Sequence, residues 1–205
     1  MADKFQLYID GAFCDADNGA VFDSVDPSTV AVWAVMPKAS AMDTDRAVRA
    51  AHAAFSAGPW PALTATARGK LLYKLADLVA RDAAVIAELE TRDTGKVIRE
   101  TKAVTGYVAE FYRYFAGLAD KIEGATLPID KPDMEVSTRR EPLGVVAAVV
   151  PWNSQMFLAA TKLGPALAGP TVGVPRAVAG DQARKTLRPG HPFRLRRGQP
   201  AVRHK

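Results

Sequence analysis

Residues 141–169 read EPLGVVAAVVPWNSQMFLAATKLGPALAG, and this stretch decides the fold. Its run Val145–Val150 is apolar and rich in β-branched side chains, a pattern typical of a parallel strand that is covered on both faces. Pro151-Trp152-Asn153 ends the strand, and a helix is expected from about Gln155 to Leu167. Strand, loop and helix in this order open a doubly wound α/β sheet, in which ligands bind at the carboxyl ends of the strands. We therefore expect the functional position at residues 151–153.

The chain before residue 125 changes from strand-like to helical periodicity. Short strands are expected first, because apolar runs alternate with turn signals such as Asp10-Gly11. From Ser40 the apolar spacing is helical, with Asp43 or Thr44 as candidate N-caps. The expected strands are Phe5–Ile9, Val21–Phe22 and Val30–Val35. The expected helices are one that breaks at Pro59, one over Thr64–Thr91 with a kink before Val85 and an end signal at Thr94-Gly95, and one that carries Val104–Leu118.

Charge divides the chain at residue 169. Residues 1–169 hold 18 Lys and Arg against 21 Asp and Glu, whereas residues 170–205 hold 9 against 1. The formal charge of +5 therefore comes from the last 36 residues, in which Arg, Pro, Gly and Ala make up 20 positions. This composition has no hydrophobic period, so we expect residues 170–205 to be a basic, disordered tail.

The cysteine content and the hydropathy exclude several classes of protein. Cys14 is the sole cysteine, which excludes an internal disulfide framework and a zinc site built from several thiolates. No run approaches the roughly 18 apolar residues that a transmembrane helix needs, and the amino terminus lacks a secretory apolar core. A soluble, cytoplasmic protein with no membrane partner is expected.

Many separated motifs, in matching order over about residues 5–169, resemble the NAD(P)-dependent aldehyde dehydrogenase superfamily. The specificity lies in their order, because no single tripeptide would carry the assignment. The motifs are Ile9-Asp10-Gly11, Val25-Asp26-Pro27-Ser28-Thr29, Asp45-Arg46-Ala47-Val48, Gly58-Pro59-Trp60, Arg68-Gly69-Lys70-Leu71-Leu72, Glu90-Thr91-Arg92-Asp93-Thr94-Gly95-Lys96, Tyr112-Arg113-Tyr114-Phe115-Ala116-Gly117, Lys121-Ile122-Glu123-Gly124, Glu141-Pro142-Leu143-Gly144, Pro151-Trp152-Asn153 and Lys162-Leu163-Gly164-Pro165.

The resemblance implies an incomplete α/β fold in four segments. Residues 1–124 would form strands and helices of the cofactor-binding domain, with a small hairpin region and a helical bundle. Residues 125–141 would form part of an oligomerisation arm, with Glu135–Arg140 matching the family's arm. Residues 142–169 would start a doubly wound, Rossmann-like sheet, and residues 170–205 would be the tail.

The family's reaction, oxidation of an aldehyde to a carboxylic acid with NAD or NADP, assigns roles to several positions. Asn153 matches the side-chain amide that stabilises the oxyanion, and Lys162 matches a lysine near the site. Val150, Pro151 and Trp152 match the strand end that lines the cofactor cleft. Asp93 and the backbone around Val25 match a monovalent-cation site found in some members.

Each role has a structural alternative. Asn153 could cap the following helix, a common use of asparagine. Lys162 could be an ordinary solvated lysine, and residues 150–152 could simply pack at the end of a strand. Cys14 is read as a small apolar residue, because its place in the amino-terminal hairpin is far from where the family's nucleophile belongs.

The family pattern stops after Gly169, before the positions of the nucleophilic cysteine, the glutamate base and the ribose anchor. We therefore expect a truncated enzyme that is inactive alone, and a frameshifted tail that is translated from GC-rich codons. The alternative is a non-catalytic binding or regulatory subunit. Its partner would be a polyanion at the tail, a second copy, or a full-length paralogue at the arm. Nucleic acid is not expected, because the tail has one aromatic residue, Phe193.

Overall fold

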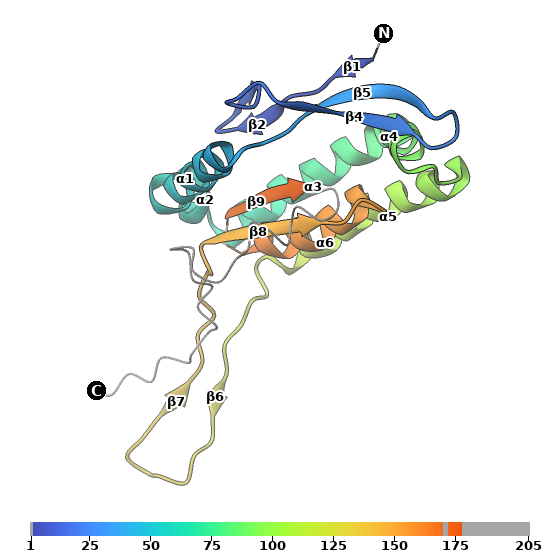
Figure 1. The fold of residues 1–205 in the computed structure, drawn as a ribbon. Coiled ribbons are helices and arrows are strands. Elements are labelled where there is room, and N and C mark those ends of the chain that lie inside the picture. Colours follow the sequence, from blue (N-terminus) through green and yellow to red (C-terminus); the bar gives the residue numbers. More distant parts are fainter. Residues whose placement is uncertain (1, 170–171, 178–205) are drawn as a thin grey trace.

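The computed structural model describes residues 2–169 and 172–177. It is an α/β structure with a small amino-terminal sheet, a group of packed helices and a short parallel sheet, and a long hairpin projects away from all of these (Figure 1). The structure is of the α/β class, and its helices and short parallel sheet resemble an incomplete doubly wound fold. The expected fold class is therefore confirmed.

The amino-terminal strands form two small sheets. Strands β1 (Asp3–Lys4), β5 (Ala31–Pro37) and β4 (Val21–Asp26) make one sheet in the order β1-β5-β4, and β2 (Leu7–Ile9) pairs antiparallel with β3 (Ala12–Cys14). The turn between β2 and β3 has positive φ at both Asp10 and Gly11, as the Asp-Gly signal predicts. The expected strand over Phe5–Ile9 is shorter in the structure, where it covers Leu7–Ile9 as β2, and the separate strand β1 precedes it in the other sheet.

Five helices of the described chain, α1 to α5, follow before the arm. Helix α1 (Ala41–Ala57) begins at Ser40, whose hydroxyl accepts from the Asp43 amide while the Asp43 carboxylate accepts from the Ser40 amide. Ser40 is therefore the N-cap, and the expectation of Asp43 or Thr44 was wrong by one turn. The next helices are α2 (Pro59–Ala62), α3 (Ala65–Arg81) and α4 (Ala83–Thr94).

The expected long helix breaks into α3 and α4 at Asp82, near the predicted kink, and α4 ends where Gly95 adopts the left-handed conformation. Helix α5 (Ile98–Leu118) packs against α3 and against α6 (Gln155–Ala168) to form the core. The core residues are mostly small or apolar, namely Leu72, Ala76, Val79, Val108, Ala109, Tyr112, Ala116, Ala119, Ala160 and Ala168. Close helix contact explains the small side chains, as at Gly164, where an added Cβ would lie 2.9 Å from the Phe115 ring.

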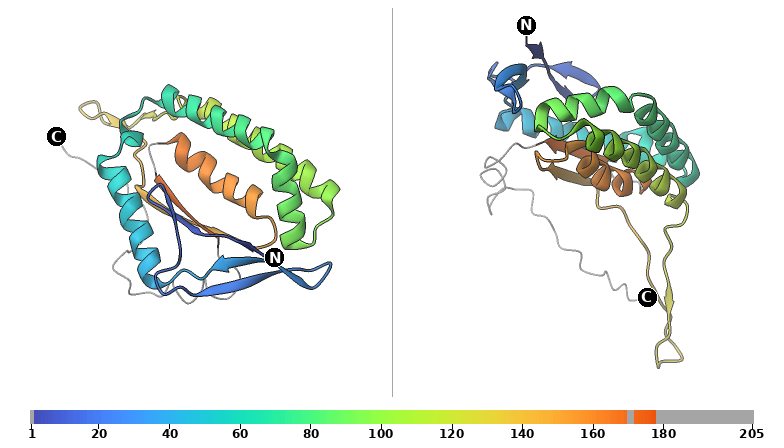
Figure 2. Two further views of the ribbon diagram at one scale, coloured as in Figure 1. Left: turned by 90° about the horizontal axis from the view of Figure 1, so that it is seen from above. Right: turned by 90° about the vertical axis from the view of Figure 1, so that its right-hand side faces the viewer.

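The strand–loop–helix unit forms as predicted, with β8 (Val145–Val150) followed by α6 (Gln155–Ala168). Ala148 and Val150 are buried but Ala147 is exposed, so only one face of β8 is well covered among the described residues. The left-hand view of Figure 2 shows α6 lying between β8 and the paired helices α3 and α5.

The tail was expected to be disordered from residue 170, and for residues 172–177 that expectation was wrong. Strand β9 (Val172–Ala177) pairs in parallel with β8, from Val145 opposite Val172 to Val150 opposite Ala177. The sequence did not predict this strand, because the segment is rich in Pro, Gly and Arg. Pro175 is compatible with this strand, because β9 has β8 as its one described neighbour. On the side of a strand that has no partner, proline's missing N–H removes no hydrogen bond. Residues 170–171 and 178–205, with the predicted disorder and frameshift, lie outside the described residues.

The hairpin of β6 (Thr126–Leu127) and β7 (Val136–Ser137) projects from the body of the molecule (Figure 1). Its two strands are antiparallel, and nearly every residue between positions 121 and 143 is exposed. This hairpin coincides with the segment expected to form an arm. Among the described residues, no helix combines the length and the apolar character needed to cross a bilayer.

Candidate functional site

The loop Pro151–Asn153 lies where the sequence analysis placed it, at the carboxyl end of β8 and before the first turn of α6. All three residues are exposed, and Trp152 has 63% of its surface accessible, while Val150 beneath them is buried. The loop is therefore an open surface at the end of a parallel strand, the usual position of a ligand site in this architecture.

The capping alternative for Asn153 is wrong, because the N-cap of α6 is Ser154. The Ser154 carbonyl accepts the first intrahelical bond from the Leu158 amide at 3.0 Å. Within the described part of the chain, the Asn153 side chain makes no hydrogen bond to protein. Its amide N–H groups are therefore available to a ligand oxygen.

Residues at the end of α4 hold the two residues that follow Asn153. Lys96 Nζ donates to Ser154 Oγ at 2.8 Å, and Gln155 Nε2 donates to Asp93 Oδ2 at 2.7 Å. The other carboxylate oxygen, Asp93 Oδ1, accepts from Ser24 Oγ of β4 at 2.6 Å. A chain of polar contacts thus joins the amino-terminal sheet, α4 and the start of α6.

Lys96 is held in turn by a buried carboxylate. Its Nζ lies 3.3 Å from Glu90 Oε1, and the Glu90 side chain is 3% exposed against 26% for Lys96. Both residues belong to the family-like motif at residues 90–96, and the sequence alone predicted no site role for either. No local signal could have predicted one, because Lys96 and Ser154 are 58 positions apart.

The predicted monovalent-cation residues lie on neighbouring elements. Asp93 contacts Ser24, which directly precedes Val25 at a register irregularity of β4. Both Asp93 oxygens already accept hydrogen bonds from side chains, so a cation there would have to share them. Across the described ranges, no group of three or more His, Cys, Asp or Glu side chains could hold a metal ion. The cation site remains a prediction.

Lys162 is half-buried on α6, nine positions after Asn153. At 1.5 Å per residue it lies about 13 Å further along the helix direction. Among the described residues it forms no ion pair or hydrogen bond. Its place near the site stays a prediction.

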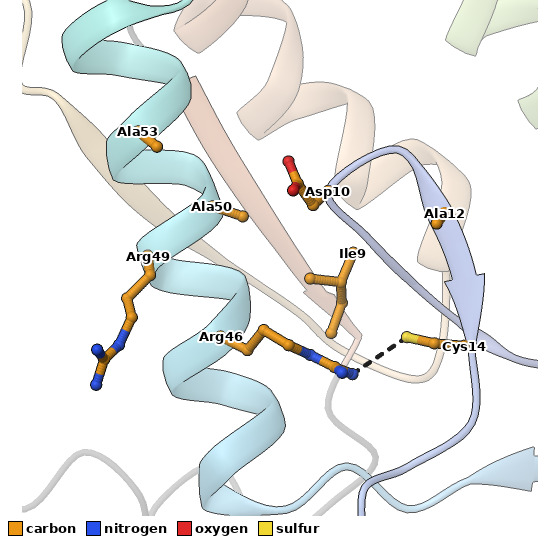
Figure 3. A pocket seen from close by; sticks show the side chains of 8 residues that line it. All are labelled: Ile9, Asp10, Ala12, Cys14, Arg46, Arg49, Ala50 and Ala53. Atoms are coloured by element: carbon orange, nitrogen blue, oxygen red, sulfur yellow. Dashed lines mark hydrogen bonds between the residues drawn. The ribbon is translucent and has the colours of Figure 1, made fainter.

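Cys14 lies on β3, beside α1, and the two elements enclose a different depression (Figure 3). Arg46 Nη2 donates to Cys14 Sγ at 3.2 Å, and the cavity of about 540 Å³ is also lined by Ile9, Asp10, Ala12, Arg49, Ala50 and Ala53. The carboxyl end of β8 does not contribute to it. This placement agrees with the expectation that Cys14 is not the family's nucleophile.

The chain belongs to the α/β class, and its exposed loop lies at the carboxyl end of a parallel strand, the position at which doubly wound sheets usually carry a ligand site. The comparisons identify the family. The aldehyde dehydrogenase family model matches residues 13–174, and the chain belongs to that family. The match extends five residues beyond Gly169, into β9.

The relatives are enzymes of greater length. The chain is 61% identical over 165 residues to (Z)-2-((N-methylformamido)methylene)-5-hydroxybutyrolactone dehydrogenase of Acinetobacter baylyi. This match covers 80% of this chain and 33% of that protein. It is 44% identical over 165 residues to mitochondrial aldehyde dehydrogenase of Rattus norvegicus, with 80% of this chain and 32% of the relative covered. The chain therefore spans about a third of the length of these relatives.

Solved structures agree. The NAD-dependent aldehyde dehydrogenase of Sinorhizobium meliloti matches with a TM-score of 0.80 and 34% identity, over 85% of this chain and 35% of that one. An aldehyde dehydrogenase of Bacillus cereus, in complex with NAD⁺, matches with a TM-score of 0.80 and 38% identity, over 84% of this chain and 35% of that one.

Proposed function

We propose that this chain is the amino-terminal portion of an NAD-dependent aldehyde dehydrogenase, in which Asn153 donates a hydrogen bond to the oxyanion of the reacting aldehyde. The observation that carries the proposal is the state of Asn153: exposed at the end of β8, not used as the helix cap, and flanked by residues that are held in place. A donor aimed at developing charge lowers the barrier most when it is oriented before the reaction.

The chemistry of an aldehyde oxidation explains why an amide suits this position. Addition of a nucleophile to the carbonyl carbon converts its oxygen to an anion, and a neutral N–H donor stabilises that charge without supplying a proton. Pro151 and Trp152 would line the adjacent cofactor cleft together with Val150. The bound NAD would supply the hydride acceptor, and the residues of this chain would orient the substrate oxygen.

We further propose that these 205 residues do not turn over an aldehyde by themselves. The sole cysteine, Cys14, packs beside Arg46 on β3 and is not at the β8 loop. Without a thiol at the loop, no group of the described chain could form the covalent intermediate on which the family's chemistry depends. NAD binding would likewise need the strands that lie beyond the matched third of the fold.

A chimaera tests the proposal. Residues 13–174 would replace the matching segment of the Acinetobacter baylyi relative, and NADH formation would be followed at 340 nm with that relative's own substrate. We expect activity in the chimaera and none in the 205-residue chain. Asn153→Ala should lower kcat of the chimaera by about 10²–10³-fold, whereas Asn18→Ala, in an exposed turn, should leave it within about twofold.

An Asn153→Ala chimaera with the kcat of the parent chimaera would refute the role of Asn153, and turnover by the chain alone would refute the need for the remainder of the fold. Full activity of the Asn153→Ala chimaera together with NADH formation by the 205-residue chain would refute both statements.

A second function, a non-catalytic subunit that pairs with an intact paralogue, is favoured by the arm. Its exposed apolar side chains Leu127, Ile129 and Met134 lie on a hairpin that projects from the body (Figure 1). Leu127→Asp should abolish co-purification with an intact enzyme if the arm makes this contact. The proposed contact of the basic tail with a polyanion lies outside the described residues.

A further inference from the structure

We propose that Lys96 is a positioning residue for Asn153, acting through Ser154, an assignment that rests on the proposed oxyanion role of Asn153. The loop that carries Asn153 is exposed and short, so its geometry depends on how its two ends are fixed. Val150 fixes the upstream end, because it is buried in the sheet. The contacts of Ser154 and Gln155 fix the downstream end.

Ser154 carries the argument because it does not behave as an N-cap serine usually does. Such a serine turns its hydroxyl toward the amides of the first helical turn. Ser154 makes no side-chain capping bond, and its Oγ accepts instead from Lys96 Nζ at 2.8 Å. A local stabilisation of α6 has been replaced by a contact with another element, directly beside Asn153.

Lys96 is built to reach this point. Gly95 has φ of 75°, which turns the chain back at the end of α4, and an added Cβ at Gly95 would lie 3.3 Å from Pro27. Glu90 lies on α4, six positions before Lys96, and its side chain is almost wholly buried. Its Oε1 atom pairs with Lys96 Nζ at 3.3 Å. Among the described residues Lys96 is the one ion-pair partner of Glu90, so the ammonium group is confined between Glu90 and Ser154.

The neighbouring contact gives the clamp a second point. Gln155 Nε2 donates to Asp93 Oδ2 at 2.7 Å, and Asp93 lies three positions before Lys96. Two consecutive residues after Asn153 are therefore bound to one helix end. Rotation of the loop about either contact alone is prevented, which confines the direction in which the Asn153 amide points.

The full chain itself provides the test, because its asparagines are Asn18 and Asn153 alone. Selective ¹⁵N-asparagine labelling gives side-chain amide signals from these two residues. Ser154→Ala removes the acceptor and leaves the Lys96–Glu90 pair intact. We expect the Asn153 amide signals to broaden or shift, the Asn18 signals to stay unchanged, and the Leu158 amide to exchange about 10-fold faster.

Lys96→Met should produce the same change, and Lys96→Arg should largely restore the original Asn153 signals. Because Lys96→Met leaves Glu90 buried without its partner, the double variant Glu90→Gln with Lys96→Met keeps the test interpretable if the single variant unfolds. Lys102→Met, an exposed lysine of α5, is the matched control and should change nothing.

Unchanged Asn153 signals in Ser154→Ala would overturn the proposal, as would equal changes at Asn18 and Asn153. This result does not depend on turnover. If the Asn153 signals change in Ser154→Ala but the chimaera shows no Asn153-dependent activity, the proposed function alone is rejected. If the Asn153 signals stay unchanged in Ser154→Ala and the chimaera shows Asn153-dependent activity, the role of Lys96 alone is rejected.

Discussion

Two helical glycines, one buried and one exposed, provide a test of the packing that supports the loop. Gly69 of α3 is buried, and a Cβ built on it would lie 2.7 Å from the Ala116 carbonyl oxygen of α5. Gly106 of α5 is exposed, and a Cβ built there would meet nothing within 4 Å. Both are helical, so Gly→Ala adds the same propensity gain at each but a clash at only one.

The expected free energies follow from this difference. Gly→Ala in a helix interior stabilises by about 0.5–1 kcal/mol, so Gly106→Ala should raise the free energy of unfolding by that amount. At Gly69 the added methyl group meets backbone, which cannot rotate away, and overpacking costs about 1–3 kcal/mol. Gly69→Ala should therefore be destabilised, and the two variants should differ by about 1–3 kcal/mol, the packing contribution alone.

Urea unfolding followed by circular dichroism at 222 nm measures both variants against the parent chain. The difference corresponds to roughly 2–4 °C in Tm for each kcal/mol in a chain of this size. Gly164→Ala should fall between them, because the 2.9 Å contact there is to the Phe115 side chain, which can move. Equal stability of Gly69→Ala and Gly106→Ala would refute the close α3–α5 contact.

Two pH dependences are expected. Burial raises the pKa of Asp43, but hydrogen bonds from Ser40 and Asp17 outweigh burial and hold that pKa below its ordinary value. The resulting stability is present above the unfolded pKa of about 3.9 and is lost as the pH falls through the folded-state pKa. Acid unfolding monitored by fluorescence should show this loss in the parent chain but not in Asp43→Asn, and identical acid profiles would contradict it. Burial raises the pKa of Tyr112 to about 12. The unfolded chain therefore loses this proton first, near pH 10, and stability should fall by about 1.4 kcal/mol between pH 9 and 11. Urea titrations at the two pH values should give a smaller loss for Tyr112→Phe, and an equal loss would count against the burial of the phenol.

Elements that depend on neighbouring residues were predicted well. The Asp10-Gly11 turn and the end of α4 at Thr94-Gly95 both require backbone conformations with positive φ, which Gly adopts without strain. The strand Val145–Val150 followed from an uninterrupted apolar run that is rich in β-branched side chains. The helix start at Ser40 was misplaced because Ser, Asp and Thr at positions 40, 43 and 44 are all plausible caps, and the choice depends on which side chain reaches which amide.

Strand β9 was missed for a different reason. A segment with Pro175 and Gly173 has low intrinsic strand propensity. It is a strand because β8 offers it an unpaired edge, and parallel pairing then satisfies its backbone groups. Its formation therefore depends on β8, which is separated from it in the sequence by the whole of α6.

The sequence by itself determined the family, the loop that carries Asn153 and the approximate positions of the main helices, because those depend on motif order, local propensity and turn chemistry. Only the tertiary structure decided that Ser154 occupies the N-cap position of α6, that Lys96 and Asp93 bind the side chains of Ser154 and Gln155, and that β9 pairs with β8. Each of these rests on groups brought together across the chain, 58 residues apart for Lys96 and Ser154. A hydrogen bond depends on distance and direction in space, and neither can be read from separation along the chain.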